Sequence, residues 1–136
     1  MAGYVSAVSW FDTQTHLRVY KSNGQTVTEQ AYDGSWYTGG FSQQGTTVGA
    51  TSWLDSGGQI HIRVYVGNSA GKITEYCWDK DKWYVGAFSA NGVGADATSW
   101  VQQGQAYIRV YVRDNQNKVT EYCWDKDKWY VGGYPS

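Results

Sequence analysis

The chain consists largely of one sequence pattern that occurs three times. In each occurrence Ser-Trp is followed by Arg-Val-Tyr, then by Thr-Glu, and finally by Trp-Tyr and a glycine. The arginines of this pattern, Arg18, Arg63 and Arg109, follow one another at intervals of 45 (63 − 18) and 46 (109 − 63) residues. A period between about 20 and 50 residues is the signature of a repeat architecture. We therefore expect the 136 residues to form a single domain of three repeats, 1–44, 45–91 and 92–136.

Each repeat contains four short runs with the character of β-strands. In the second repeat these are residues 50–53, 60–66, 73–78 and 83–88, which are rich in Val, Ile, Thr, Tyr and Trp and are separated by Gly, Asn, Asp and Ser. Such runs are typical of half-buried strands. In residues 60–66 the aliphatic side chains alternate with others, as expected for a strand with two different faces. No segment has a sustained helical period.

The repeat length distinguishes between two all-β folds. Four antiparallel strands in about 40–45 residues correspond to one propeller blade, and propellers commonly have about 4–8 blades. Three blades cannot close a ring, so the pattern predicts a β-propeller with three four-stranded blades per chain, completed to six blades by homodimerisation. A β-trefoil is the alternative. It fits less well, because Leu is scarce here and 8 Trp and 12 Tyr dominate the apolar residues.

The composition disfavours several classes of partner. The net charge is −1 and no basic stripe is present, so nucleic acid is not expected as a ligand. No stretch approaches the roughly 18 apolar residues of a membrane span, which predicts no membrane insertion. The start of the chain has neither a basic nor an apolar signal region, so we expect no secretory signal peptide. Export by another route stays open, and the compartment is not predicted.

No metal or cofactor is expected. Cys77 and Cys123 occupy the same position in neighbouring repeats, which predicts buried free thiols rather than a disulfide. His16 and His61 also share a position, which Tyr107 fills in the third repeat, so a packing or lining role is favoured over metal ligation. The alternating Asp and Lys of residues 79–82 and 125–128 are interpreted as solvated turns.

A charged pair recurs next to a hairpin in every repeat. Asn-Gly is a strong hairpin signal, and a two-residue turn at Asn23 and Gly24 would place Arg18 directly opposite Glu29. Directly opposed side chains lie about 4.5–5.5 Å apart at Cβ. By itself this would be a surface ion pair of little energetic value, about 0–1 kcal/mol. The equivalent pairs are Arg63 with Glu75 and Arg109 with Glu121.

Aromatic residues accompany this pair and change its interpretation. A pair of aromatic residues flanks the last turn of each repeat: Trp78 and Trp83, Trp124 and Trp129, and Tyr32 and Trp36. A planar donor, a carboxylate acceptor and indole faces together suit a neutral polyol with one apolar face. The tryptophans of the first run, Trp10, Trp53 and Trp100, are instead expected in the core between blades.

These motifs closely resemble the Aleuria aurantia-type fucose-binding lectins of fungi and bacteria, over nearly the whole chain. Ser-Trp, Ile-Arg-Val-Tyr, Ile-Thr-Glu-Tyr-Cys-Trp-Asp and Trp-Tyr-Val-Gly-Ala-Phe occur in order. The resemblance implies a six-bladed propeller with sugar sites between adjacent blades. One blade would provide Arg and Glu, and the next would provide the aromatic pair.

The resemblance implies three sites per chain. The first comprises Arg18, Glu29 and Gly40 with Trp78 and Trp83, and the second comprises Arg63, Glu75 and Ala87 with Trp124 and Trp129. The third comprises Arg109, Glu121 and Gly133, completed by Tyr32 and Trp36 of the partner subunit. The implied ligand is L-fucose, whose methyl group would suit an apolar wall of Ile62, Ile108 or Ala87. Tyr32 in place of Trp, and Gly40 and Gly133 where Ala is common, leave the sugar preference open.

The function expected from these features is non-catalytic, multivalent binding of L-fucose or fucosylated glycans. A lectin of the same fold with another preference, galactose-type or other, is one alternative, and a protein-interaction propeller is another. A glycosidase is disfavoured, because glycosidases use two carboxylates about 5–9.5 Å apart and each expected pocket has one Glu beside an Arg. An enzyme is therefore not expected.

Overall fold

The computed structural model describes residues 4–135, and all the regular secondary structure in that range is β-strand. The twelve strands are β1 (Val5–Phe11), β2 (Thr15–Ser22), β3 (Thr26–Tyr32), β4 (Trp36–Gln44), β5 (Thr47–Leu54), β6 (Ile60–Gly67), β7 (Lys72–Trp78), β8 (Trp83–Asn91), β9 (Gly94–Gln102), β10 (Gln105–Arg113), β11 (Val119–Trp124) and β12 (Trp129–Val131). They form three antiparallel sheets, β1–β4, β5–β8 and β9–β12, each with its strands in chain order. We call these sheets blades 1, 2 and 3. No helix in the described part of the chain is long and apolar enough to cross a membrane.

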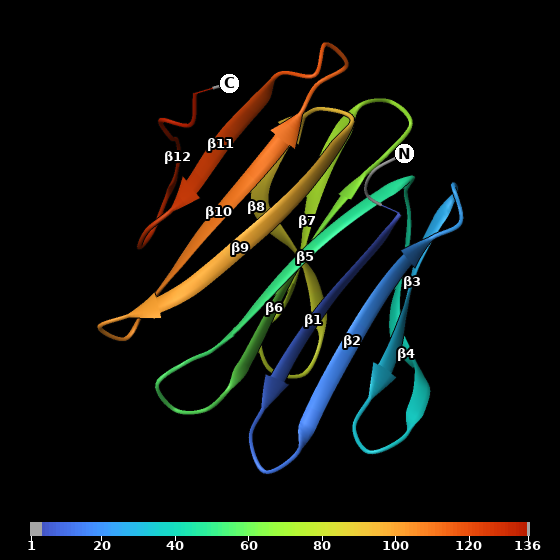
Figure 1. Cartoon of the computed structure of the whole chain (residues 1–136), viewed down its shortest axis with the longest axis vertical. Helices are drawn as coiled ribbons and strands as arrows, with labels where there is room; N and C mark the ends of the chain where they lie inside the picture. Colours follow the sequence, from blue (N-terminus) through green and yellow to red (C-terminus); the bar gives the residue numbers. More distant parts are fainter. Residues whose placement is uncertain (1–3, 136) are drawn as a thin grey trace.

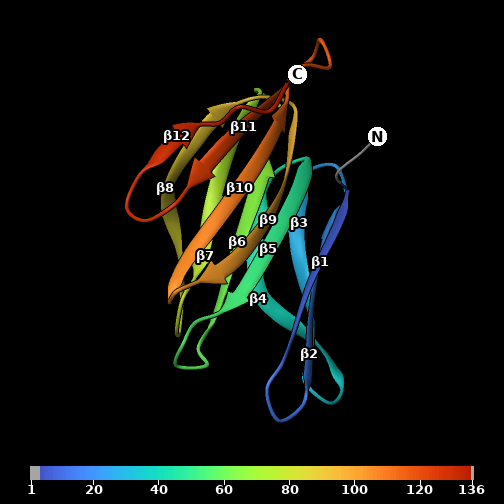
Figure 2. The ribbon, with the colours of Figure 1, turned by 60° about the vertical axis from the view of Figure 1, so that its left-hand side comes forward.

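The first strands of the blades, β1, β5 and β9, lie side by side, and the blades fan out from them (Figures 1 and 2). The serine of the Ser-Trp motif links neighbouring blades. Ser99 Oγ donates a hydrogen bond of 3.1 Å to the carbonyl of Ser52, and Ser52 Oγ donates one of 3.4 Å to the carbonyl of Ser9. A hydroxyl that bonds the backbone of the preceding blade explains why this motif recurs with the period of the blades.

Two hydrophobic cores lie between the blades. Tyr20, Val27 and Phe41 of blade 1 pack on one face of blade 2, whose Ile62, Val64 and Val66 belong to the same cluster. The second core repeats this arrangement between blades 2 and 3, with Tyr65, Ile73 and Phe88 against Ile108, Val110 and Val112. Val64 and Val110 are 0% exposed, and such a burial stabilises the fold by about 1.5–3 kcal/mol per side chain. The alternation predicted for residues 60–66 is confirmed.

The pairing predicted across the first hairpin is wrong. Arg18 lies opposite Ala31, and the partner of Glu29 is Tyr20. The connection is longer than a two-residue turn because Asn23 Oδ1 accepts hydrogen bonds from the backbone N–H groups of Gln25 and Thr26, an Asx turn. The register consequently shifts by two residues, which preserves the face of each side chain. The same shift places Tyr65 opposite Glu75 and Tyr111 opposite Glu121.

The two cysteines have the state that was predicted. Cys77 and Cys123 are both buried and free. Burial raises the pKa of the Cys77 thiol to about 12, so this thiol is neutral at physiological pH. Within residues 4–135, no group of three or more His, Cys, Asp or Glu is arranged to hold a metal ion.

Candidate functional site

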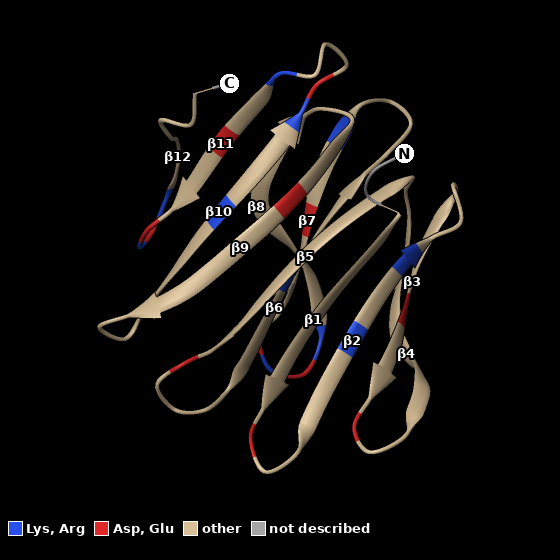
Figure 3. Cartoon of the chain, in the orientation of Figure 1, with Lys and Arg blue, Asp and Glu red and all other residues tan. Residues whose placement is uncertain are grey.

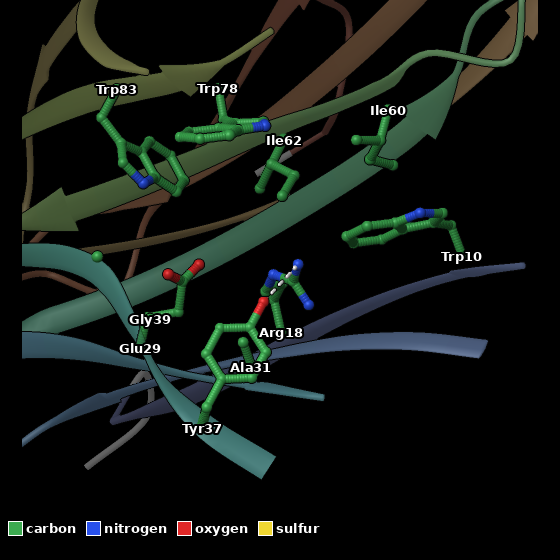
Figure 4. A pocket seen from close by; sticks show the side chains of 11 residues that line it. Trp10, Arg18, Glu29, Ala31, Tyr37, Gly39, Ile60, Ile62, Trp78 and Trp83 are labelled. Atoms are coloured by element: carbon green, nitrogen blue, oxygen red, sulfur yellow. Dashed lines mark hydrogen bonds between the residues drawn. The ribbon is translucent and has the colours of Figure 1, made fainter. Parts of the chain in front are cut away.

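Two similar cavities lie between neighbouring blades. The first pocket, of about 290 Å³, lies between blades 1 and 2 and is drawn in Figure 4. It is lined by Trp10, Arg18, Glu29, Ala31, Tyr37, Gly39, Gly40, Ile60, Ile62, Trp78 and Trp83. The second pocket, of about 260 Å³, lies between blades 2 and 3 and is lined by Trp53, Arg63, Glu75, Cys77, Tyr84, Gly86, Ala87, Ile108, Trp124 and Trp129.

The structure therefore brings together every residue that was expected in the first two sites. Most charged residues lie near strand ends or in loops (Figure 3), whereas Arg18, Glu29 and their counterparts lie within strands. A charge in the middle of a strand that packs on a neighbouring blade is costly unless it is paired. Its presence there marks the site, and the partners of each charge explain how it is tolerated.

The glutamate is buried and held by two donors. Glu29 is 4% exposed; it accepts a 2.7 Å hydrogen bond from the Tyr20 hydroxyl and a longer one, 3.4 Å, from the Phe41 N–H. Burial and then the nearby carboxylate raise the pKa of Tyr20, which keeps its phenol a donor. A bulge in the pairing of β3 with β4 falls at this residue and directs it into the pocket. In the second pocket the same roles belong to Glu75, Tyr65 and Phe88.

A glycine next to each glutamate was not among the residues expected in the sites. A Cβ atom at Gly39 would overlap Oε1 of Glu29, so a side chain at this position would displace the glutamate. The sequence carried a signal, because the equivalent Gly86 and Gly132 stand in the other repeats and are equally close to their glutamates. At Gly40, in contrast, a Cβ would meet nothing within 4 Å. This is the position of Ala87 in the second pocket.

The arginine was expected to pair with the glutamate, but it pairs with an aspartate. The Arg18 guanidinium donates to both carboxylate oxygens of Asp33, at 2.9 and 3.1 Å, and to the Leu17 carbonyl at 2.8 Å. The reason is that the oxygens of Glu29 already accept from Tyr20 and Phe41, while the turn after β3 places Asp33 in line with the guanidinium. In the second pocket Arg63 binds Asp79, at 2.7 and 3.3 Å.

Asp79 and Asp125 were expected to lie in solvated turns. The first aspartate of the last turn in each blade is instead bound to the arginine of that blade. Asp125 accepts a 2.6 Å hydrogen bond from Arg109. Desolvation opposes ionisation of Asp33, but hydrogen bonds from Arg18, Tyr37 and His16 together hold its pKa well below the usual range. These aspartates fix the orientation of the arginine that lines each pocket.

The tryptophans of the Ser-Trp motif have a second role besides packing. Trp10 and Trp53 contact the cores, as expected, but they also line the two pockets. The guanidinium carbon of Arg18 lies 4.9 Å from the centre of the Trp10 ring, and that of Arg63 lies 4.9 Å from the Trp53 ring, a cation–π arrangement. The prediction of a core position is wrong for Trp100, which is 39% exposed and belongs to neither core, because no further blade within residues 4–135 packs on blade 3. Trp100 contacts Arg109 in the same way as the other two tryptophans contact their arginines.

The two histidines lie behind these tryptophans. His16 stacks on Trp10, with ring centres 4.8 Å apart, and His61 stacks on Trp53 at 5.3 Å. Both histidine nitrogens of His61 lie near carboxylates, Asp79 at 2.7 Å and Asp55 at 2.8 Å. The predicted packing role is thus accompanied by a polar one.

The opposite wall of each pocket is apolar and belongs to the next blade. Trp78 and Trp83 face Glu29 and Arg18 across the first cavity, and Ile62 lies beside them (Figure 4). The two indole rings are 5.6 Å apart and tilted by 56°. Trp124, Trp129 and Ile108 form this wall in the second pocket. A small ring with hydroxyl groups on one edge and C–H groups on one face matches the two walls.

The residues expected in the third site do not meet within one chain. Glu121 accepts hydrogen bonds from the Tyr111 hydroxyl at 2.7 Å and from the Tyr134 N–H at 3.1 Å, as in the other blades. Arg109, Glu121 and Gly133 belong to blade 3, whereas Tyr32 and Trp36 belong to blade 1, and blade 2 lies between them (Figure 1). Trp36 is 55% exposed. The chain thus carries two separate half-sites.

Comparison with known proteins agrees with this arrangement. Residues 1–134 match the protein family described as fungal fucose-specific lectin. The structure of a fucose lectin from Kordia zhangzhouensis in complex with methyl-fucoside is 50% identical, with a TM-score of 0.85 over 96% of this chain and 99% of that chain. A crystal structure of the Aleuria aurantia lectin, described as a six-bladed β-propeller, is 30% identical, with a TM-score of 0.75 over 98% of this chain.

The chain is much shorter than the lectin of Aleuria aurantia. It covers 45% of the six-bladed chain in the crystal structure, which confirms three propeller blades. The curated fucose-specific lectin of Aleuria aurantia is 36% identical over an alignment of 87 residues, and the match covers 57% of this chain and 26% of that protein. With a family match over nearly its whole length, this chain belongs to the fungal fucose-specific lectins.

Proposed function

We propose that this protein binds L-fucose and fucosylated glycans, without catalysis, in the pockets between its blades. One repeated arrangement carries the proposal. In each pocket an arginine and a buried glutamate face a pair of tryptophans and an isoleucine. Two related structures support the choice of sugar: the Kordia zhangzhouensis lectin holds methyl-fucoside and an Aleuria aurantia lectin mutant holds Fucα1-6GlcNAc.

Each wall has a distinct role in this proposal. Arg18 and Arg63 donate to sugar hydroxyls, and Glu29 and Glu75 accept from them. Hydrogen bonds to charged groups contribute about 1.5–3 kcal/mol each. The indole rings and the isoleucine cover C–H groups and the methyl group of a 6-deoxy sugar. Hydrolysis is not part of the proposal, because Glu29 is the one carboxylate among the described residues that line the first pocket.

We further propose that one domain of three blades, with repeats 1–44, 45–91 and 92–136, pairs with a second copy to close a six-bladed ring. The third pocket would then comprise Arg109, Glu121 and Gly133 with Tyr32 and Trp36 of the partner subunit. The two half-sites support an interface between chains, because Glu121 is held by the same kinds of donor as the glutamates of the complete pockets and Trp36 is 55% exposed. The outer face of blade 1 is more polar than the equivalent faces inside the chain. Exposed Lys21 and Gln30 stand where blade 2 has Val66 and Tyr76.

Glycan-array binding followed by calorimetry tests the proposal. We expect fucosylated glycans to bind above all others, α-methyl-L-fucoside to saturate the protein, and no bound glycan to be hydrolysed. Strongest binding to galactose-type glycans would favour the shifted preference, and binding to no glycan would favour an interaction propeller. Light scattering should give twice the 15.2 kDa of the chain, and a folded monomer at micromolar concentration would contradict the ring.

A further inference from the structure

The two complete pockets differ at one position of the apolar wall. Ile60 lines the first pocket two residues before Ile62, and in Figure 4 it lies beside Trp10 at the end of the cavity away from Trp83. The equivalent residue before Ile108 is Ala106. An alanine leaves space that an isoleucine fills, so the second interface is less filled at this end.

A further cavity of about 270 Å³ lies at this place in the second interface. It is lined by Trp53, Asp55, His61, Arg63, Asp79, Val101, Gly104 and Ala106. Trp53 and Arg63 also line the second pocket, so the two cavities adjoin. We call the new cavity the side pocket. Its volume is close to that of the second pocket, so where one holds a sugar ring the other has room for another.

The turn between β9 and β10 contributes to this opening. It consists of Gln103 and Gly104 alone, both with positive φ, 53° and 76°, which is typical of a tight two-residue hairpin. Blades 1 and 2 have longer connections at the same place, residues 12–14 and 55–59. Gly104 of this short turn lines the side pocket and places no side chain in it.

The lining of the side pocket suits a hydroxylated ring. Trp53, Val101 and Ala106 offer apolar surface, and Asp55, which is partly exposed, offers a carboxylate. His61 bridges Asp55 and Asp79 and holds their oxygens in place. An aromatic face beside fixed acceptors is the arrangement that the main pockets use, although here the acceptors are aspartates.

We propose that the side pocket is a subsite for the sugar unit attached to the monosaccharide in the second pocket, and that Ala106 opens it. The proposal rests on the proposed function of the second pocket. In the first interface the bulkier Ile60 occupies the equivalent position. The two complete pockets of one chain therefore differ in specificity: the second distinguishes fucosides by their neighbouring sugar more strongly than the first.

The test isolates the second pocket and compares ligands of two lengths. A parent with Arg18→Ala and Arg109→Ala silences the other sites. Calorimetry then measures α-methyl-L-fucoside and a panel of fucosyl disaccharides of different linkages, Fucα1-6GlcNAc among them. We expect at least one disaccharide to bind about 5- to 10-fold more tightly than methyl-fucoside. Ala106→Ile should remove that gain and leave the affinity for methyl-fucoside within about twofold.

Two further variants secure the interpretation. Ala106→Val fills part of the side pocket and should remove part of the gain. It keeps the test decisive if the isoleucine variant folds poorly. Ala70→Ile, in the exposed loop between β6 and β7, adds the same group elsewhere and should change nothing. If methyl-fucoside itself does not bind to the parent, the proposed function fails. If it binds but no disaccharide gains affinity, or the gain survives both substitutions at Ala106, only the side pocket is refuted.

Discussion

Replacing Glu75 with glutamine tests the polar wall of the second pocket with almost no change in shape. The carboxylate is 3% exposed and accepts from the Tyr65 hydroxyl at 2.8 Å and the Phe88 N–H at 3.3 Å. A glutamine has one acceptor oxygen where the glutamate has two. Whichever way the amide is turned, its NH₂ group faces a donor or the sugar hydroxyl that the carboxylate would accept from.

The expected loss follows from these contacts. Removing a hydrogen bond to a charged group costs about 1.5–3 kcal/mol, so Glu75→Gln should weaken methyl-fucoside binding at this pocket by about 10- to 150-fold. A buried donor left without its partner costs about 1–3 kcal/mol, so the melting temperature should also fall. The protein should nevertheless remain folded at 25 °C, because the substitution removes no apolar side chain from either core.

The assay uses calorimetry on the parent that carries Arg18→Ala and Arg109→Ala. Asp81→Asn is the matched control: it neutralises an exposed carboxylate in the neighbouring turn of the same blade and should leave binding unchanged. Binding by Glu75→Gln within about twofold of the parent would refute the argument that the buried carboxylate accepts from the sugar. Equal losses from Glu75→Gln and Asp81→Asn would point to the charge of the region instead.

Three other outcomes are expected. Gly39→Ala should abolish binding at the first pocket, because its methyl group would displace Glu29, whereas Gly40→Ala should keep the fold and the binding there. Calorimetry distinguishes the two variants, and equal sugar affinity in both would contradict the contact assigned to Gly39. The folded-state pKa of Asp33 lies below its ordinary value of 3.8, so its stabilisation is present above that pH and is lost as the pH falls toward the folded pKa. Urea unfolding between pH 6 and 3 should show this decrease, and Asp33→Asn should flatten it; an unchanged slope would contradict the pairing. Tyr32→Trp should strengthen the weakest class of sites in a titration, and no change would exclude Tyr32 from the third pocket.

The repeat period and the strand pattern were enough to predict the blades, because both depend on local composition. The register across the first hairpin was not, because the Asx turn at Asn23 depends on side-chain hydrogen bonds that the Asn-Gly signal does not specify. That error carried into the predicted partner of Arg18. Its place beside Glu29 in the pocket survived, since a shift of two residues keeps every side chain on its face.

Other parts of the site depend on contacts between elements. In the sequence Asp79 is one charge among several in a polar turn, and only the fold shows that it accepts a hydrogen bond from Arg63. Gly39 is needed because a bulge brings Glu29 against its backbone. The double role of Trp53 arises because the edge of a core is also the wall of a pocket. Sequence periodicity carries no information on such contacts.

A crystal structure with α-methyl-L-fucoside tests the central claim most directly. We predict a closed six-bladed ring of two chains. One sugar should lie in each pocket between the arginine and glutamate of one blade and the aromatic pair of the next. At both junctions between the chains, Tyr32 and Trp36 of the partner subunit should contact the sugar. Sugars bound away from Arg18, Arg63 and Arg109, or blades 1 and 3 left uncovered by a second chain, would contradict it.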